Sequence, residues 1–186
     1  MINKIINRYR REIAKNTLIN NLCNSLFWLI ILIFIFSFIE SIFYLDTNMR
    51  YKIFSIVSSF AIALLLYSIF KFLIIHYGLL ENYNDITVSK IIGEKHQSIK
   101  DGLTNIIQIQ KLQDADKSLI KLAKNKLNNK LNNVFNKITN VKTSKIKIYH
   151  TLFCLIVFIF LVTIFNLNQP INRIINFNKN FDPPLP

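Results

Sequence analysis

The sequence predicts an all-α membrane protein with three transmembrane helices and a cytoplasmic helical hairpin between the second and third. Three observations predict this fold class. Apolar stretches at about 26–45, 53–75 and 148–167 each reach the length of roughly 20 residues that a helix needs to cross a bilayer. Basic residues concentrate in alternate segments between these stretches. The polar segment 77–147 carries apolar residues at helical spacing.

The composition favours lipid, rather than a soluble core, around the apolar stretches. The chain has 186 residues, of which 52% are hydrophobic and 18% are charged. Residues 26–36 have no polar face at all. A helix that is apolar all round lies either deep in a large protein or in lipid. A chain of this size cannot bury three such helices in one core, so we expect lipid to be their solvent.

The distribution of charge predicts the orientation of the spans. Residues 1–25 carry five basic residues and one acid, and residues 77–147 carry thirteen and six. The link 45–52 and the tail 166–186 each carry two basic residues and one acid. Lys and Arg near the ends of spans stay on the cytoplasmic side. We therefore expect a cytoplasmic N-terminus, a cytoplasmic middle segment and an extracytoplasmic tail, in a bacterial inner membrane.

The first part of the chain is interpreted as a basic cytoplasmic segment, 1–25, followed by a transmembrane hairpin, 26–76. The first span is expected to remain as a signal anchor, because residues 40–44 do not form a small-residue cleavage site. Glu40 lies near the outer end of this span, and Lys71 lies near the inner end of the second. Ionisable residues inside spans are functional candidates. We expect both to snorkel toward water; the alternative is an ion or proton path.

Residues 77–147 are expected to form two amphipathic helices with a break at residues 114–116, where an acidic residue suits a helix start. Apolar residues spaced three or four apart form one stripe on each helix. The first stripe comprises Ile99, Leu103, Ile106 and Ile107, with Leu112 as a candidate for its last position. The second comprises Leu119, Ile120, Ala123, Leu127, Leu131, Val134, Phe135 and Ile138.

The favoured role of the stripes is to pack the two helices against each other and against the membrane end of the bundle. A second interpretation places the helix on the inner leaflet, with anionic lipid headgroups contacted by Lys117, Lys121, Lys124 and Lys130. A third is a coiled coil with a second copy or with another protein. Nucleic acid is not an expected partner, because the basic residues lack interleaved aromatic side chains and a recognisable binding motif.

The sequence offers no catalytic, cofactor-binding or metal-binding constellation. His76, His96 and His150 are far apart and lack other ligands at metal spacing. The chain contains three Gly residues, too few for a glycine-rich phosphate loop. Cys23 and Cys154 are expected to be free thiols near the reducing cytoplasmic side. We therefore predict that the protein is not an enzyme and binds no cofactor.

Residues 91–109 resemble a segment of a family of large bacterial envelope proteins of unknown function, domain-of-unknown-function family 4175. The matching positions are Gly93, Asp101, Leu103, Asn105 and Gln108, whereas Gly102 stands where the family usually has a basic residue. The tail at 177–184 is similar to the segment that leads from the family's third span to an extracytoplasmic region.

The resemblance implies a membrane-anchoring N-terminal region of a longer protein, and it carries over no catalytic residue. Residues 168–186 are accordingly interpreted as an extracytoplasmic linker, because the Pro-rich segment 182–186 favours an extended chain, and we expect this linker to be truncated. The predicted function is an inner-membrane anchor or scaffold that tethers an extracytoplasmic part and presents the cytoplasmic hairpin. The alternative is a subunit of an oligomeric transporter or channel.

Overall fold

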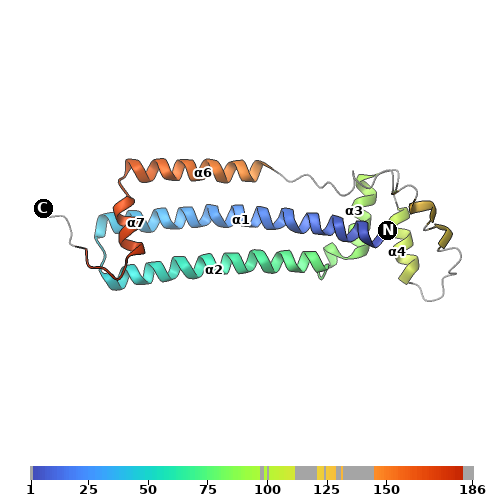
Figure 1. Cartoon of the computed structure of the whole chain (residues 1–186), viewed down its shortest axis with the longest axis horizontal. Coiled ribbons are helices and arrows are strands. Elements are labelled where there is room, and N and C mark those ends of the chain that lie inside the picture. The colour runs from blue at the N-terminus through green and yellow to red at the C-terminus, as the bar shows by residue number, and fades with distance from the viewer. Residues whose placement is uncertain are drawn as a thin grey trace. The chain divides into compact units, whose positions relative to one another are not determined.

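The computed structural model describes residues 2–96, 99, 101–111, 121–123, 125–128, 131 and 145–181, and the regular structure in these ranges is helical (Figure 1). Three of its helices are long and apolar enough to cross a membrane: α1 (Ile2–Phe43), α2 (Thr47–Tyr77) and α6 (Lys145–Ile164). Their most apolar stretches are only 11%, 11% and 6% buried within the protein. The three predicted apolar spans are therefore confirmed as helices that are long and apolar enough to cross a membrane and that the rest of the protein covers only slightly.

Helix α1 begins much earlier than the first predicted span. The basic segment 1–25 and the apolar stretch that follows it form one continuous helix of 42 residues. At about 1.5 Å per residue such a helix is roughly 60 Å long, twice the thickness of a bilayer's hydrocarbon core. The amino-terminal part of α1 therefore belongs to a different packing environment from its apolar part.

The chain divides into two compact units, which are described separately. The first unit comprises 1–18 and 70–143, and the second comprises 19–69 and 144–186. Helices α1 and α2 each contribute one end to the first unit and the rest of their length, which is apolar, to the second unit.

In the second unit, a three-residue turn reverses the chain between α1 and α2. Tyr44 adopts a left-handed conformation with φ of 44°. The side chain of Asp46 then accepts a hydrogen bond from Met49 N at 3.1 Å, which caps the first turn of α2. This short turn makes α1 and α2 antiparallel neighbours (Figure 1).

Helix α6 lies alongside α1 through a series of aromatic contacts. Phe34 meets Phe158, and Phe38 meets Phe165, with ring centroids 6.5 and 6.1 Å apart. Nearer the start of α6, Phe27 meets the ring of His150 at 6.4 Å. Residue numbers increase together along both helices, so α6 runs parallel to α1.

A short helix, α7 (Asn168–Ile175), follows α6 where the sequence predicts a linker. The predicted linker 168–186 is therefore wrong over these residues, while residues 182–186 lie outside the described part. Asn166 turns the chain between α6 and α7 in a left-handed conformation with φ of 51°, which Asn adopts more readily than most residues. Ile174 is buried against the α1–α2 hairpin, and this burial explains why the segment folds.

The first unit has its own hydrophobic core. A 3-10 turn, η1 (Glu81–Tyr83), leads into α3 (Asp85–Lys95) and α4 (Gly102–Lys111), which pack together. Asn84 caps α3 by accepting a hydrogen bond from Thr87 N at 2.8 Å. The core joins the amino-terminal face of α1 to these helices through Ile2, Ile5, Ile6, Tyr9, Val88, Ile92, Ile99, Leu103, Ile106, Ile107, Leu127 and Leu131.

This core confirms the first predicted stripe at Ile99, Leu103, Ile106 and Ile107, which are all buried, whereas Leu112 lies outside the described residues. In the second stripe, Leu127 and Leu131 are buried, whereas Ala123 is exposed. Leu119, Ile120, Val134, Phe135 and Ile138 lie outside the described residues, as does the predicted break at 114–116. Helix α3 and the apolar face at the start of α1 are core elements that the sequence-based prediction omits.

Candidate functional site: a buried charge cluster

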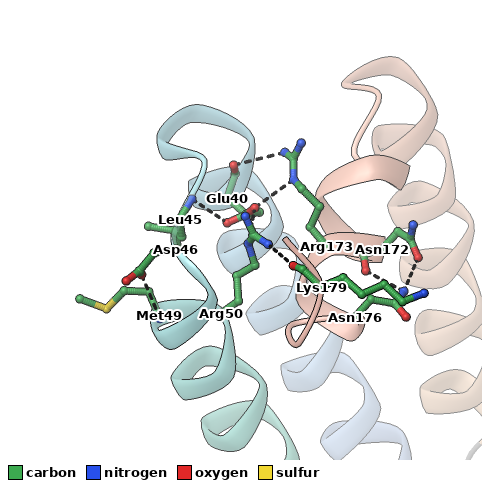
Figure 2. A network of polar contacts seen from close by, with 9 residues as sticks. All are labelled: Glu40, Leu45, Asp46, Met49, Arg50, Asn172, Arg173, Asn176 and Lys179. Atoms are coloured by element: carbon green, nitrogen blue, oxygen red, sulfur yellow. Dashed lines mark hydrogen bonds and ion pairs between the residues drawn. The ribbon is translucent and has the colours of Figure 1, made fainter. Parts of the chain in front are cut away.

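The second unit contains a buried charge cluster of Glu40, Arg50 and Arg173, which we call the Glu40 cluster (Figure 2). Glu40 lies in the last turn of α1, Arg50 in the first turns of α2, and Arg173 in α7. The residues are 0%, 3% and 7% exposed. Three elements that are apart in the sequence therefore meet at one carboxylate.

The contacts to Glu40 hold both the side chain and the turn that follows it. Arg173 Nε donates to Glu40 Oε1 at 2.9 Å, and Arg173 Nη2 lies 3.5 Å from the Glu40 carbonyl oxygen. Leu45 N donates to Glu40 Oε2 at 3.1 Å. The carboxylate thus also fixes the turn between α1 and α2.

Arg50 joins the cluster in a different way. Its Nε lies 3.2 Å from Glu40 Oε1, within ion-pair distance, but that N–H makes no hydrogen bond with the described residues. Its Nη1 donates to the carbonyl oxygen of Lys179 at 3.2 Å. Arg50 therefore ties the beginning of α2 to the tail that follows α7 (Figure 2).

Aromatic rings cover both guanidinium groups. The Cζ of Arg173 lies 4.4 Å from the ring centroid of Tyr44, and that of Arg50 lies 5.2 Å from the ring centroid of Phe181. Such cation–π contacts strengthen as water is excluded. The rings and the carboxylate together replace the water that the two arginines give up on burial.

The cluster corrects one prediction about the charged residues in the spans. Glu40 does not snorkel toward water, because its side chain is fully buried and paired with two arginines. The same ion pairs join the α1–α2 turn and the tail at one end of the second unit. Lys71 is half-buried at the other end of α2 and belongs to the first unit; its predicted snorkelling stays a prediction.

Sequence reasoning missed Arg50 and Arg173 as partners of Glu40. Arg50 lies in the link 45–52 and Arg173 in the tail 166–186, two segments that the charge distribution predicts to lie on the same side of the membrane. An acid at the end of one span, combined with an arginine in each neighbouring outer segment, is a signal that could have identified the group.

An apolar cavity of about 150 Å³ adjoins the Glu40 cluster in the second unit. Its lining comes from α1, α2 and α7, the same elements that supply the charges: Ile33, Phe36, Ser37, Ile53, Phe54, Val57, Ser58, Ile171, Ile174 and Ile175. Ser37 is fully buried, and its hydroxyl makes no hydrogen bond to the described residues. By contrast, Ser68 in α2 donates to its own helix, at Leu64 O, over 2.8 Å.

The first unit has two polar contacts of its own. Arg10 forms an ion pair with Asp85 at the start of α3. Lys95 Nζ, at the end of α3, donates to the hydroxyl of Tyr9 at 3.0 Å. These contacts fasten both ends of α3 to the amino-terminal part of α1 and are structural in character.

The residues expected to bind anionic lipid are mostly outside the described part of the chain. Lys121 is described and exposed, whereas Lys117, Lys124 and Lys130 are not described.

Cys23 and Cys154 are free thiols, and Cys154 Sγ lies 3.7 Å from His150 Nδ1. Within the described residues, no group of three or more His, Cys, Asp or Glu side chains is arranged to hold a metal ion.

Comparison of the chain with protein-family models, with curated proteins and with solved structures finds no match.

Proposed function

We propose that the protein is a membrane anchor or scaffold of a bacterial inner membrane, which holds its tail at the outer surface and presents the first unit in the cytoplasm. One observation carries this proposal: the Glu40 cluster ties the end of α1, the start of α2 and the segment after α6 to a common point. A segment held by buried ion pairs at the end of two spans is fixed relative to the membrane.

The chemistry of the cluster favours a structural role over an ion path. A conducting carboxylate needs water and an exchangeable partner, whereas Glu40 is fully buried and engages two arginines and a backbone N–H. The alternative, a transporter or channel subunit, lacks a comparable polar seam among the described residues of α1, α2 and α6.

The orientation in this proposal derives from the excess of Lys and Arg in residues 1–25 and 77–147. Its bacterial setting derives from the resemblance of residues 91–109 to the envelope family. The first unit, a helical module with its own core, is the part that would meet a cytoplasmic partner.

The proposal is tested by joining a folded reporter to the tail and locating it in a bacterial host. We expect the reporter to be outside the cytoplasm and to remain with the membrane after alkaline carbonate extraction, because three spans hold it there. In parallel, liposomes containing the purified protein should pass no more ions than empty liposomes. A reporter released by carbonate would contradict the anchor, and an ion flux abolished by Glu40→Gln would favour the transporter alternative.

A further inference from the structure

The Glu40 cluster carries more positive than negative charge. Arg50 and Arg173 share one carboxylate, so the buried group has a formal charge of +1. The exposed charged residues near it on the same elements, Asp46, Lys52 and Lys179, add a further +1. The described residues at this end of the second unit therefore attract an anion.

Within the described residues, the hydrogen bonds of the two arginines use only some of their donors. Arg173 binds Glu40 through Nε and Nη2, and Arg50 uses Nη1 for Lys179 O. A guanidinium has five N–H donors. Neither Arg173 Nη1 nor Arg50 Nη2 takes part in these hydrogen bonds of the described residues.

The apolar cavity lies next to this charge, within reach of a single amphiphilic molecule. Ser37 lies three residues, less than one helical turn, before Glu40 on α1, and Ile53 lies three residues after Arg50 on α2. Ile174 directly follows Arg173 in α7. The cavity wall and the charged residues are therefore adjacent parts of the same three helices.

The hydroxyl of Ser37 provides a third, independent indication of a ligand. A buried hydroxyl without a hydrogen-bond partner costs free energy, and such groups are rare in folded proteins. Here the orphan hydroxyl lines an otherwise apolar cavity of about 150 Å³. An ester carbonyl, which accepts a hydrogen bond and is attached to an alkyl chain, would satisfy the hydroxyl and fill the cavity.

We propose that this end of the second unit binds one anionic phospholipid from the adjoining leaflet, with its acyl chain in the cavity, an ester carbonyl at Ser37 and its phosphate near the arginines. The apolar walls select a lipid chain, and the net positive charge selects an anionic headgroup over a zwitterionic one. This inference rests on α1, α2 and α6 spanning a bilayer, and it holds whether or not the protein is an anchor.

The test uses the full-length protein in nanodiscs that contain equal amounts of phosphatidylglycerol and phosphatidylcholine, followed by native mass spectrometry of the lipid retained. We expect one phosphatidylglycerol per chain, favoured over phosphatidylcholine by about fivefold, the factor that corresponds to about 1 kcal/mol for one cation near anionic lipid. Equal retention of the two lipids by the wild-type protein would overturn the proposal.

Two variants separate the headgroup from the chain. Arg173→Gln leaves Glu40 and Arg50 balanced and should abolish the preference for phosphatidylglycerol. Val57→Phe, which fills the cavity, should reduce retention of both lipids. Lys90→Gln, which removes an exposed charge from α3 in the first unit, is the matched control and should change neither.

Soluble glycerol phosphate, added in excess, distinguishes a lipid from a free phosphate compound. We expect it to leave phosphatidylglycerol in place, because the chain contributes to binding; displacement by glycerol phosphate would contradict the lipid assignment. If Arg173→Gln fails to fold, Val57→Phe and the wild-type competition still decide the outcome. Equal retention of the two lipids by the wild-type protein, with the reporter still held at the membrane, would refute this inference and leave the anchor intact.

Discussion

Replacing Glu40 by Gln removes the shared counter-charge of two buried arginines and so tests the central polar feature of the second unit. The carboxylate meets Arg173 Nε at 2.9 Å, Leu45 N at 3.1 Å and Arg50 Nε at 3.2 Å. Gln keeps one oxygen as an acceptor but leaves two like charges buried and unpaired. Breaking a buried ion pair in this way costs about 3–5 kcal/mol.

The expected loss is large enough to measure as a change in melting temperature. For a chain of 150–250 residues, 1 kcal/mol corresponds to roughly 2–4 °C, so Glu40→Gln should lower the Tm in detergent by about 10 °C. Hydrogen exchange gives a local check, because the Leu45 amide loses its carboxylate acceptor and should exchange faster. The control is Glu12→Gln, in the same helix.

Glu12 pairs with Lys15 at 3.1 Å in a partly exposed position. Such a pair contributes about 0.5 kcal/mol, so its loss should lower the Tm by no more than about 2 °C. An equal decrease in Tm for Glu40→Gln and Glu12→Gln would refute the conclusion that Glu40 stabilises the cluster by pairing with both arginines. Replacing all three members of the cluster with apolar residues of similar size should recover most of the lost stability.

Three further changes address the first unit, each read as thermal stability of the full-length protein. Gly78→Ala should destabilise it by about 1–2 kcal/mol, because Gly78 has φ of 66° and an added Cβ would lie 2.9 Å from Arg10 Cζ; an unchanged Tm would contradict this conformation. Asn84→Ala should cost about 1 kcal/mol through loss of the cap to Thr87 N, whereas Asn84→Asp should retain it. Leu103→Ala should cost about 2–5 kcal/mol, because Leu103 is fully buried in the core, and a loss below 1 kcal/mol would show that this core does not stabilise the unit.

The sequence predicted the spans well because their signal is local. Every position between residues 26 and 36 is apolar, so no knowledge of distant contacts is needed. The stripe beginning at Ile99 was predictable for the same reason, since its spacing alone defines a helix face. The apolar positions at Ile2, Ile5, Ile6 and Tyr9 show equally regular spacing, but the sequence analysis uses only the basic residues of this segment, as a signal of orientation.

The Glu40 cluster could not be predicted in the same way, because its geometry depends on long-range packing. Arg173 lies 133 residues after Glu40, and its position depends on α7, a helix in a segment that reads as a linker. Burial of Ile174 against the hairpin, rather than helix propensity, explains why α7 forms. Snorkelling is the default for a charge near the end of a span, and tertiary pairing overrides it here.

The most direct test of the membrane account is the accessibility of single cysteines, introduced in a background without Cys23 and Cys154, to an impermeant thiol reagent in intact cells. Asn48 follows the α1–α2 turn, Asn178 follows α7, and Asn129 lies in the central polar segment. We expect cysteines at positions 48 and 178 to react from outside and a cysteine at position 129 to react only after the cells are opened. Labelling of position 129 in intact cells, or different accessibility of positions 48 and 178, would contradict three spans joined at one end by the Glu40 cluster.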